Sequence, residues 1–212
     1  MRYIIMCGGD YTRFERPKQI TEINGEILVA RTIRLLQENG VKDISISSNN
    51  DVFEQFGVPV LHHNNTWTVR GAKDVSGYWV DCFYPTSEPA CYVFGDVYFS
   101  PEAIKKIVET DTSDIMLFGS KKPFAPDYPK PYREPFAYKV RDQKHFREAI
   151  KRTKELHKRN AFTRHPIAWE LWKVIRGTPL RKGPRGYTVI NDYTCDIDTP
   201  EEVQNDKYNS SI

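Results

Sequence analysis

The apolar residues of the chain fall into short runs that alternate with segments of helical spacing. Residues 2–6 form a largely apolar run before a glycine pair, apolar positions then recur with helical period over 27–36 as far as Gly40, and residues 43–47 are strand-like again. The first 50 residues therefore predict strand, glycine loop, helix and strand. Such a unit normally makes a right-handed crossover in a parallel sheet.

The same alternation continues to the end of the chain. Ser100 before Pro101 and Thr199 before Pro200 are typical helix starts, and a glutamate after Pro200 completes a capping box. The pattern predicts an α/β fold, with one domain over residues 1–212 built on a doubly wound, mostly parallel sheet. We expect further strands at 58–61, 91–94, 115–118, 136–140 and 187–195, and further helices at 73–83, 101–109, 143–159, 166–177 and from 199 onwards.

One segment of the C-terminal half interrupts this alternation. Five prolines lie within residues 123–135, which predicts an irregular or extended loop because proline lacks the backbone N–H that helices and sheets require. The helices expected at 143–159 and 166–177 follow it. We expect residues of about 121–182 to form a loop and helical insertion within the domain.

Composition places the chain among globular proteins. Apolar residues make up 39% and charged residues 28%, and no apolar stretch approaches the roughly 20 residues that cross a bilayer. The four cysteines are widely and irregularly spaced, which indicates neither a zinc site nor a disulfide framework and favours a cytoplasmic location. The net charge is only +3, and its excess lies within residues 141–159. Nothing in the pattern indicates an oligomeric state.

The loop after the first strand carries the strongest chemical signal. Gly8 and Gly9 have no Cβ atoms, so backbone amides there can approach a phosphate and donate to it. Arg13 and Lys18 bring two positive charges to the same place, which suits a triphosphate. The glycines alone would make only a tight turn, and their spacing is neither that of a Walker loop nor that of a dinucleotide fingerprint.

The longer pattern of Gly-Gly, then Thr-Arg, then Pro-Lys resembles the signature of nucleotidyltransferases that join a nucleoside triphosphate to a phosphorylated small molecule. This group includes sugar-1-phosphate pyrophosphorylases, cytidylyltransferases and molybdenum-cofactor guanylyltransferases. The resemblance implies a nucleotide-diphospho-sugar transferase-like (GT-A-like) fold, a Mg²⁺-dependent reaction that releases pyrophosphate, a place in sugar nucleotide biosynthesis, and catalytic roles for Arg13 and Lys18. The nucleotide-binding residues that it implies are Cys7, Gly8, Gly9, Asp10, Tyr11, Thr12 and Ser76.

Two later motifs extend the resemblance. Residues 93–99 are similar to the strand whose Gly-Asp supplies a magnesium ligand in the family, and residues 195–199 are similar to its late aspartate motif. The resemblance thus implies Asp96 and Asp198 as Mg²⁺ ligands, with Asp196 as the less favoured neighbour. Mg²⁺ prefers carboxylate and phosphate oxygens, and ligands of open α/β sheets bind at the carboxyl ends of strands. Alternatively, Asp96 is a turn residue, and Asp198 favours the dipole of the next helix.

The two substrates are less well defined. Residues 64–77 lie where related enzymes contact the nucleobase, but they do not identify the base, and only family analogy with short chains favours CTP or UTP. In this family the later half of the chain mostly determines the phosphorylated acceptor. The acceptor-binding candidates are Lys130, Arg133, Glu134 and Tyr138.

Two other functions fit parts of the sequence. A GT-A-type glycosyltransferase would use a nucleotide sugar, but it usually carries an Asp-x-Asp motif on the middle strand, which is not present in residues 93–99. A nucleic-acid-binding module would use the basic residues of 141–159 with interleaved aromatic residues. Those aromatic residues have the helical spacing of a core rather than of a flat stacking surface, which argues against this function, and they are Phe146, Phe162, Trp169 and Trp172.

Overall fold

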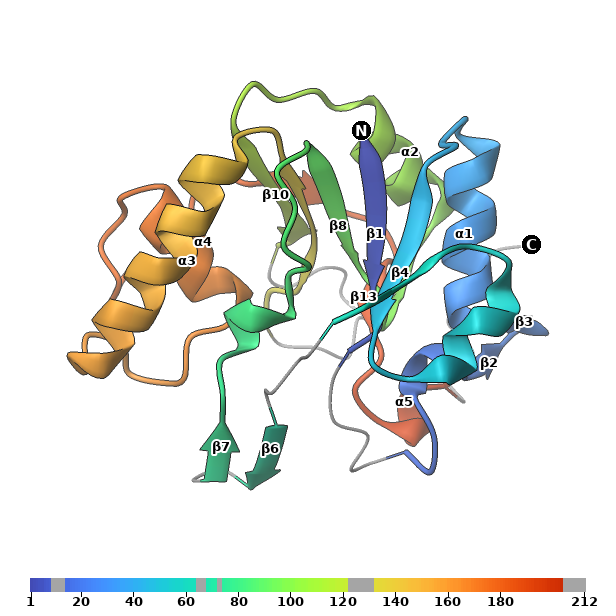
Figure 1. The fold of residues 1–212 in the computed structure, drawn as a ribbon, viewed down its shortest axis with the longest axis horizontal. Coiled ribbons are helices and arrows are strands. Elements are labelled where there is room, and N and C mark those ends of the chain that lie inside the picture. The colour runs from blue at the N-terminus through green and yellow to red at the C-terminus, as the bar shows by residue number, and fades with distance from the viewer. Residues whose placement is uncertain (9–13, 64–67, 72–73, 122–131, 204–212) are drawn as a thin grey trace.

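A seven-stranded sheet forms the centre of the protein (Figure 1). The computed structural model describes residues 1–8, 14–63, 68–71, 74–121 and 132–203, and the side chains of 68–71 and 74–76 lie outside this description. In spatial order the strands are β12 (Thr188–Ile190), β10 (Ile115–Ser120), β11 (Pro135–Val140), β8 (Ala90–Phe94), β1 (Arg2–Met6), β4 (Ile44–Ser48) and β5 (Val60–His62). Strand β11 is antiparallel to both of its neighbours, and the other pairs are parallel.

The order of the strands reverses at the centre of this sheet. From β1 the chain moves outward to β4 and β5, and it then returns to add β8 on the opposite side of β1. Both β4 and β8 pair with β1 in parallel. This confirms the predicted doubly wound, mostly parallel sheet. In such sheets the crevice beyond the carboxyl ends of the two strands at the reversal is the usual ligand site.

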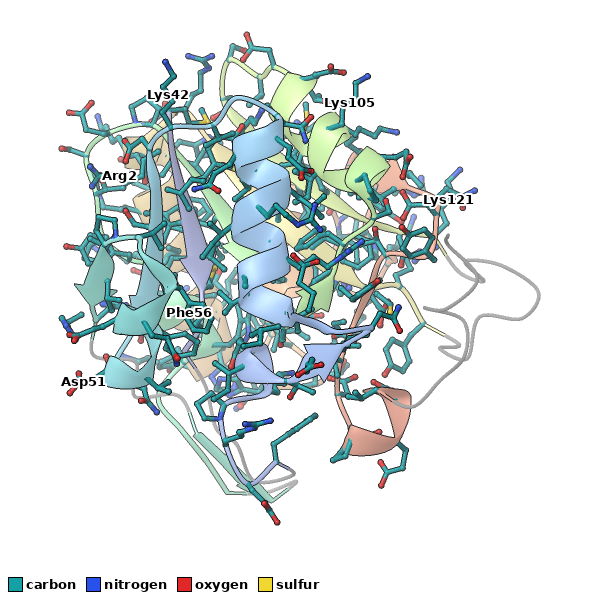
Figure 2. The ribbon with its side chains drawn as sticks, turned by 90° about the vertical axis from the view of Figure 1, so that its right-hand side faces the viewer. Arg2, Lys42, Asp51, Phe56, Lys105 and Lys121 are labelled. Carbon is teal, nitrogen blue, oxygen red and sulfur yellow. The ribbon has the colours of Figure 1, made fainter. Side chains whose placement is uncertain are left out.

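Helices cover both faces of the sheet. The helices α1 (Leu28–Glu38) and α2 (Pro101–Glu109) lie together on one face, in front of the strands in Figure 2. The helices α3 (Gln143–Lys158) and α4 (Ala168–Ile175) pack together on the other face (Figure 1). Helix α2 begins where it was predicted, because the Ser100 hydroxyl accepts a hydrogen bond from the Ala103 N–H at 2.9 Å and Pro101 follows the cap.

An aromatic cluster joins α3 and α4 to the sheet. The ring of Phe146 on α3 stacks on Tyr92 of β8 at 5.8 Å, and Tyr138 of β11 donates its hydroxyl to the Ala168 carbonyl at 2.7 Å. Phe146, Trp169 and Trp172 are all buried. These aromatic side chains therefore belong to the core, and they do not form the stacking surface that a nucleic-acid-binding module would need.

Two segments differ from the sequence prediction. The prediction of a helix at 73–83 is wrong, because this segment contains β7 (Asp74–Ser76) and the 3₁₀ helix η3 (Trp79–Cys82). Between them Gly77 has a left-handed φ of +72°, a conformation that does not continue a right-handed helix. The strand expected at 187–195 is two strands, because the chain leaves β12 and bends before β13 (Cys195–Asp196). Asp192 stabilises this bend by accepting hydrogen bonds from the Thr194 N–H and the Ser100 hydroxyl, both at 2.8 Å.

The remaining elements are short and lie around the main sheet. The strands β2 and β3 form a small hairpin ahead of α1, β6 pairs with β7, and β9 pairs with β13. Their bounds, with those of the other short helices, are β2 (Glu22–Ile23), β3 (Glu26–Ile27), β6 (Thr68–Gly71), β9 (Val97–Tyr98), η1 (Lys18–Ile20), η2 (Asp51–Phe56) and α5 (Pro200–Val203).

Gly95 is required where β8 ends against β1. Its N–H donates to the Met6 carbonyl at 3.0 Å, and a Cβ at this position would stand 2.6 Å from that oxygen and 2.7 Å from the Cys7 sulfur. Gly95→Ala is therefore expected to lower the free energy of unfolding by about 1–3 kcal/mol, as overpacking of a core does. Urea denaturation measures this change. Gly183→Ala is the control, since its Cβ would meet only the flexible end of Arg133, and an equal loss in both variants would contradict the prediction.

Candidate active site

The carboxyl end of β1 is held in place by its neighbour β4. The Cys7 N–H donates to the Ser47 carbonyl at 2.9 Å, and the Ser48 hydroxyl donates to the Cys7 carbonyl at 3.0 Å. Burial, and secondarily the charge of Asp96, raise the pKa of the Cys7 thiol well above its usual value. The thiol is therefore neutral and unsuited to act as a nucleophile. Of the predicted loop residues, Gly9, Asp10, Tyr11, Thr12 and Arg13 lie outside the described residues.

The late aspartate motif lies beside Asp96 because β13 pairs with β9. Asp196 is opposite Val97 in this antiparallel pair, and the Ile197 N–H donates to the Asp96 carbonyl at 2.8 Å. Alternate residues of an extended chain face the same side. Asp196 and Asp198 accordingly border the same cavities, whereas the side chain of Ile197 is buried.

Lys18 places its ammonium group among these carboxylates. Its Nζ atom lies 2.7 Å from Asp96 Oδ2 and 3.9 Å from Asp198 Oδ1. Burial acts to lower the pKa of this ammonium, but the carboxylates of Asp96, Asp196 and Asp198 outweigh burial and raise it. Lys18 is thus a fixed positive charge at neutral pH. The structure brings together residues that the sequence analysis had selected from three separate motifs.

Asp198 lies just before the final helix and contacts it through its backbone. Its backbone N–H donates to Glu202 Oε2 at 2.7 Å, so the capping interaction predicted at Thr199 lies one residue earlier. The Asp198 carboxylate accepts a hydrogen bond from the Tyr132 hydroxyl at 3.2 Å and faces Lys18. This geometry leaves the carboxylate at the mouth of the cavity, where a ligand can reach it.

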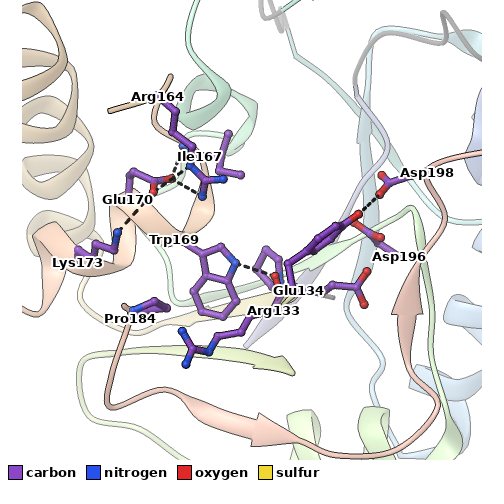
Figure 3. Close-up of a pocket in the computed structure, with 12 residues that line it drawn as sticks. Arg133, Glu134, Arg164, Ile167, Trp169, Glu170, Lys173, Pro184, Asp196 and Asp198 are labelled. Carbon is purple, nitrogen blue, oxygen red and sulfur yellow. Dashed lines mark hydrogen bonds and ion pairs between the residues drawn. The ribbon is translucent and has the colours of Figure 1, made fainter. Parts of the chain in front are cut away.

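Two adjoining cavities meet at the carboxylates. The first, of about 250 Å³, lies beyond the ends of β1 and β8, at the reversal of the sheet. It is lined by Met6, Gly8, Lys18, Trp79, Cys82, Phe94, Asp96, Pro135, Ile167, Ala168, Asp196 and Asp198. The second, of about 510 Å³, shares Pro135, Ile167, Asp196 and Asp198 with the first and extends toward α4 (Figure 3).

The second cavity contains two of the predicted acceptor residues. Arg133 and Glu134 line it, and the polar side chains of α4 close its far end. Tyr138 does not reach it, because its side chain is fully buried and its hydroxyl is bonded to the Ala168 carbonyl, so we remove Tyr138 from the acceptor candidates. Lys130 lies outside the described residues. Ser76 lies in β7, but its side chain is outside the description.

Several cavity residues had no signal in the sequence. Trp79 and Cys82 fall in the segment that was expected to be helical, and Trp169 has the spacing of a core residue. Tyr132 is the exception, because it is next to Arg133 in the insertion loop, and a stricter search of the neighbours of the basic residues would have found it. The other three face the cavities only through tertiary packing.

A comparison with known protein families identifies the chain. A model of the MobA-like NTP transferase domain matches residues 3–168, which is more than half of the chain. The chain belongs to this family. This agrees with the resemblance in the glycine loop and establishes a nucleotidyltransferase.

Solved structures agree with this NTP transferase in fold. The inositol-1-phosphate CTP transferase from T. maritima has a TM-score of 0.60 at 18% identity, covering 98% of this chain and 93% of that one. A protein described as a glucose-1-phosphate thymidylyltransferase from Bacillus anthracis has a TM-score of 0.55 at 16% identity, covering 99% and 94%. HddC from Yersinia pseudotuberculosis has a TM-score of 0.53 at 16% identity, covering 96% of each chain. None of the helices among the described residues of this NTP transferase is long and apolar enough to span a membrane.

Proposed function

We propose that the protein is a cytoplasmic, Mg²⁺-dependent nucleotidyltransferase of sugar nucleotide biosynthesis, which joins a nucleoside triphosphate to a phosphorylated small molecule such as a sugar phosphate and releases pyrophosphate. The observation that carries this proposal is the meeting of Lys18, Asp96 and Asp198 at the reversal of the sheet, between the two cavities. One cavity suits the triphosphate and the other the acceptor. The reaction takes place where they join.

The residues present fit a magnesium ion. Mg²⁺ is usually held by one or two carboxylates together with substrate phosphates. Asp96 and Asp198 offer such oxygens, and both already lie close to one cationic group, the Lys18 ammonium, which supports this proposal. These two residues would hold the ion, with Asp196 beside them. A bound Mg²⁺ would neutralise the negative charge on the reacting phosphates.

The reaction that we propose needs little proton transfer. An oxygen of the acceptor phosphate attacks the α-phosphorus of the nucleotide, a P–O bond forms, and the bond between the α-phosphorus and its bridging oxygen breaks with its electron pair on pyrophosphate. The nucleophile is already ionised, so no general base is required. Lys18 supplies fixed positive charge near the phosphates, and the backbone at Gly8 allows their close approach, with Arg13 as the expected second cation.

The identity of the nucleotide can be tested by thermal stability. We expect CTP or UTP with Mg²⁺ to raise the melting temperature by about 5–10 °C at 100 times its dissociation constant, because ligand binding at that excess contributes about 2.7 kcal/mol. GTP, ATP and dTTP are the comparisons, measured by scanning fluorimetry. A larger shift with one of them would overturn the preference for a pyrimidine ribonucleotide.

The proposed activity itself is tested by pyrophosphate release. The protein is incubated with each triphosphate, Mg²⁺ and a panel of sugar phosphates, sugar acid phosphates and sugar bisphosphates. Release that depends on both substrates supports the proposal. Absence of pyrophosphate with every pair would overturn it, and release of a nucleoside diphosphate from a nucleotide sugar would indicate a glycosyltransferase instead.

A further inference from the structure

The second cavity, which the proposed function assigns to the acceptor, has two ends of opposite charge. Asp196 and Asp198 lie at the end that joins the reaction site. At the other end the cavity is bordered by three cations, Arg133, Arg164 and Lys173. Figure 3 shows the Arg133 side chain extending away from the aspartates and toward Pro184.

Among the described residues, Glu170 is the carboxylate that pairs with two of these cations, Arg164 and Lys173. Glu170, whose side chain is 6% exposed, accepts both hydrogen bonds of the Arg164 fork at 3.1 and 3.2 Å and lies 3.6 Å from the Lys173 ammonium. It also accepts the Ile167 N–H at 3.2 Å and so caps α4. Among the described residues, no carboxylate forms an ion pair with Arg133. Counted over the described residues, this end of the cavity therefore carries more cations than carboxylates paired with them.

Arg133 is held in place although it has no ionic partner in the described part of the chain. Its carbonyl accepts a hydrogen bond from Trp169 Nε1 at 3.2 Å, and its guanidinium lies near the Tyr187 hydroxyl, whose pKa is raised by burial while the Arg133 charge acts to lower it. Gly183 lets this guanidinium approach closely, since a Cβ there would stand 3.0 Å from Nη1. An arginine with its backbone and side chain fixed in this way is preorganised for a ligand.

The wall between the two ends is apolar. Trp169 packs against Gly119 of β10, where a Cβ would be only 2.8 Å from the indole ring, and it meets Tyr187 edge to face at 5.0 Å. Pro135 and Ile167 complete this wall. A ligand that spans the cavity thus has a polar contact at each end and an apolar surface between them.

We infer that the acceptor carries a second anionic group, a carboxylate or a second phosphate, remote from the phosphate that attacks the nucleotide, and that Arg133 binds this group. The inference rests on the proposed function. The attacking phosphate would lie at the acidic end, where Lys18, together with a Mg²⁺ ion if one is held by the aspartates, would balance its charge. A second anion at the opposite end balances the excess of cations, and the planar guanidinium of Arg133 matches a carboxylate or phosphate with two parallel hydrogen bonds.

The experiment compares acceptors that differ only in the remote group. Glucose 1-phosphate, glucuronic acid 1-phosphate and glucose 1,6-bisphosphate offer a hydroxyl, a carboxylate and a phosphate at one position. We expect kcat/KM for one of the acidic acceptors to exceed that for the neutral one by about 10- to 100-fold, the range for a hydrogen bond between charged groups. The better of the two acidic acceptors identifies the anion.

Variants locate the effect at Arg133. Arg133→Gln is expected to reduce the ratio of kcat/KM between acidic and neutral acceptors to about 1, and Arg133→Lys, which keeps the charge but not the fork, to leave an intermediate ratio. Arg181→Gln, an exposed arginine outside the cavity, is the matched control and should keep the wild-type ratio. Melting temperatures confirm that each variant is folded.

The possible failures are distinct. Pyrophosphate release at equal kcat/KM from neutral and acidic acceptors would overturn the inference and leave the proposed function intact. A preference for acidic acceptors that survives in Arg133→Gln would overturn the assignment to Arg133. No release from any acceptor and triphosphate would contradict the proposed function itself.

Discussion

Asp96→Asn is expected to lower kcat/KM for nucleotidyl transfer by about 100- to 1,000-fold, the loss seen when one preorganised electrostatic group is removed from an active site. The carboxylate lies 2.7 Å from the Lys18 ammonium and is about 29% exposed, so it is close to the reaction and open to a ligand. Asparagine keeps the shape but not the charge. Because a metal ligand is lost, the Mg²⁺ concentration that gives half of the maximal rate should also rise, measured by pyrophosphate release.

The controls separate this effect from a change in folding. Asp111→Asn removes an exposed carboxylate paired with Arg141, far from the cavities, and should leave the rate near wild type. Asp198→Asn should resemble Asp96→Asn, whereas Asp196→Asn should cost less. Near-normal turnover in Asp96→Asn would show that the metal assignment is wrong, and a larger loss at Asp196 than at Asp198 would exchange those two residues.

Lys18→Met is expected to lower kcat by about 100-fold and, at the same time, to tighten the apparent binding of Mg²⁺ by about tenfold. The rate falls because the triphosphate loses a positive charge. Metal binding improves because the ammonium that pairs with Asp96 and Asp198 no longer competes for their oxygens. Two unit charges 4 Å apart near a protein surface interact by about 4 kcal/mol, so the smaller change expected for a partly exposed pair is about 1.4 kcal/mol.

The opposite signs of the two effects make this prediction specific. Titration of the rate with Mg²⁺ gives kcat and the apparent metal affinity together. Lys105→Met, an exposed lysine on α2, is the control and should change neither. Because the pKa of Lys18 is raised, its pairing with the carboxylates is complete below the ordinary pKa of lysine and is lost only as the pH rises through the raised value. A change of pH within the neutral range should therefore not reproduce the effects of Lys18→Met. A loss of rate with weaker metal binding would contradict the proposed role of Lys18.

The sequence by itself determined most of the secondary structure and half of the candidate site. Amphipathic spacing and caps located α1, α2 and α3, because these signals act between residues close in the chain. The roles of Lys18, Asp96 and Asp198 were implied by the family resemblance, each through a short motif next to a strand or helix. The residue types in those motifs are tied to local backbone geometry, as Gly95 shows by leaving no space for a Cβ.

Only the tertiary structure decided which of these residues meet. The antiparallel β9–β13 pair brings Asp198 to Asp96 across about half of the chain, and no local pattern encodes such a contact. The same holds for the acceptor cavity: Tyr138 was an acceptor candidate but is fully buried away from the cavity, whereas Trp169, which has the spacing of a core residue and is largely buried, also lines the cavity. Spacing along the chain predicts which face of an element is apolar. Whether that face meets another element or a ligand depends on the packing of segments far apart in sequence.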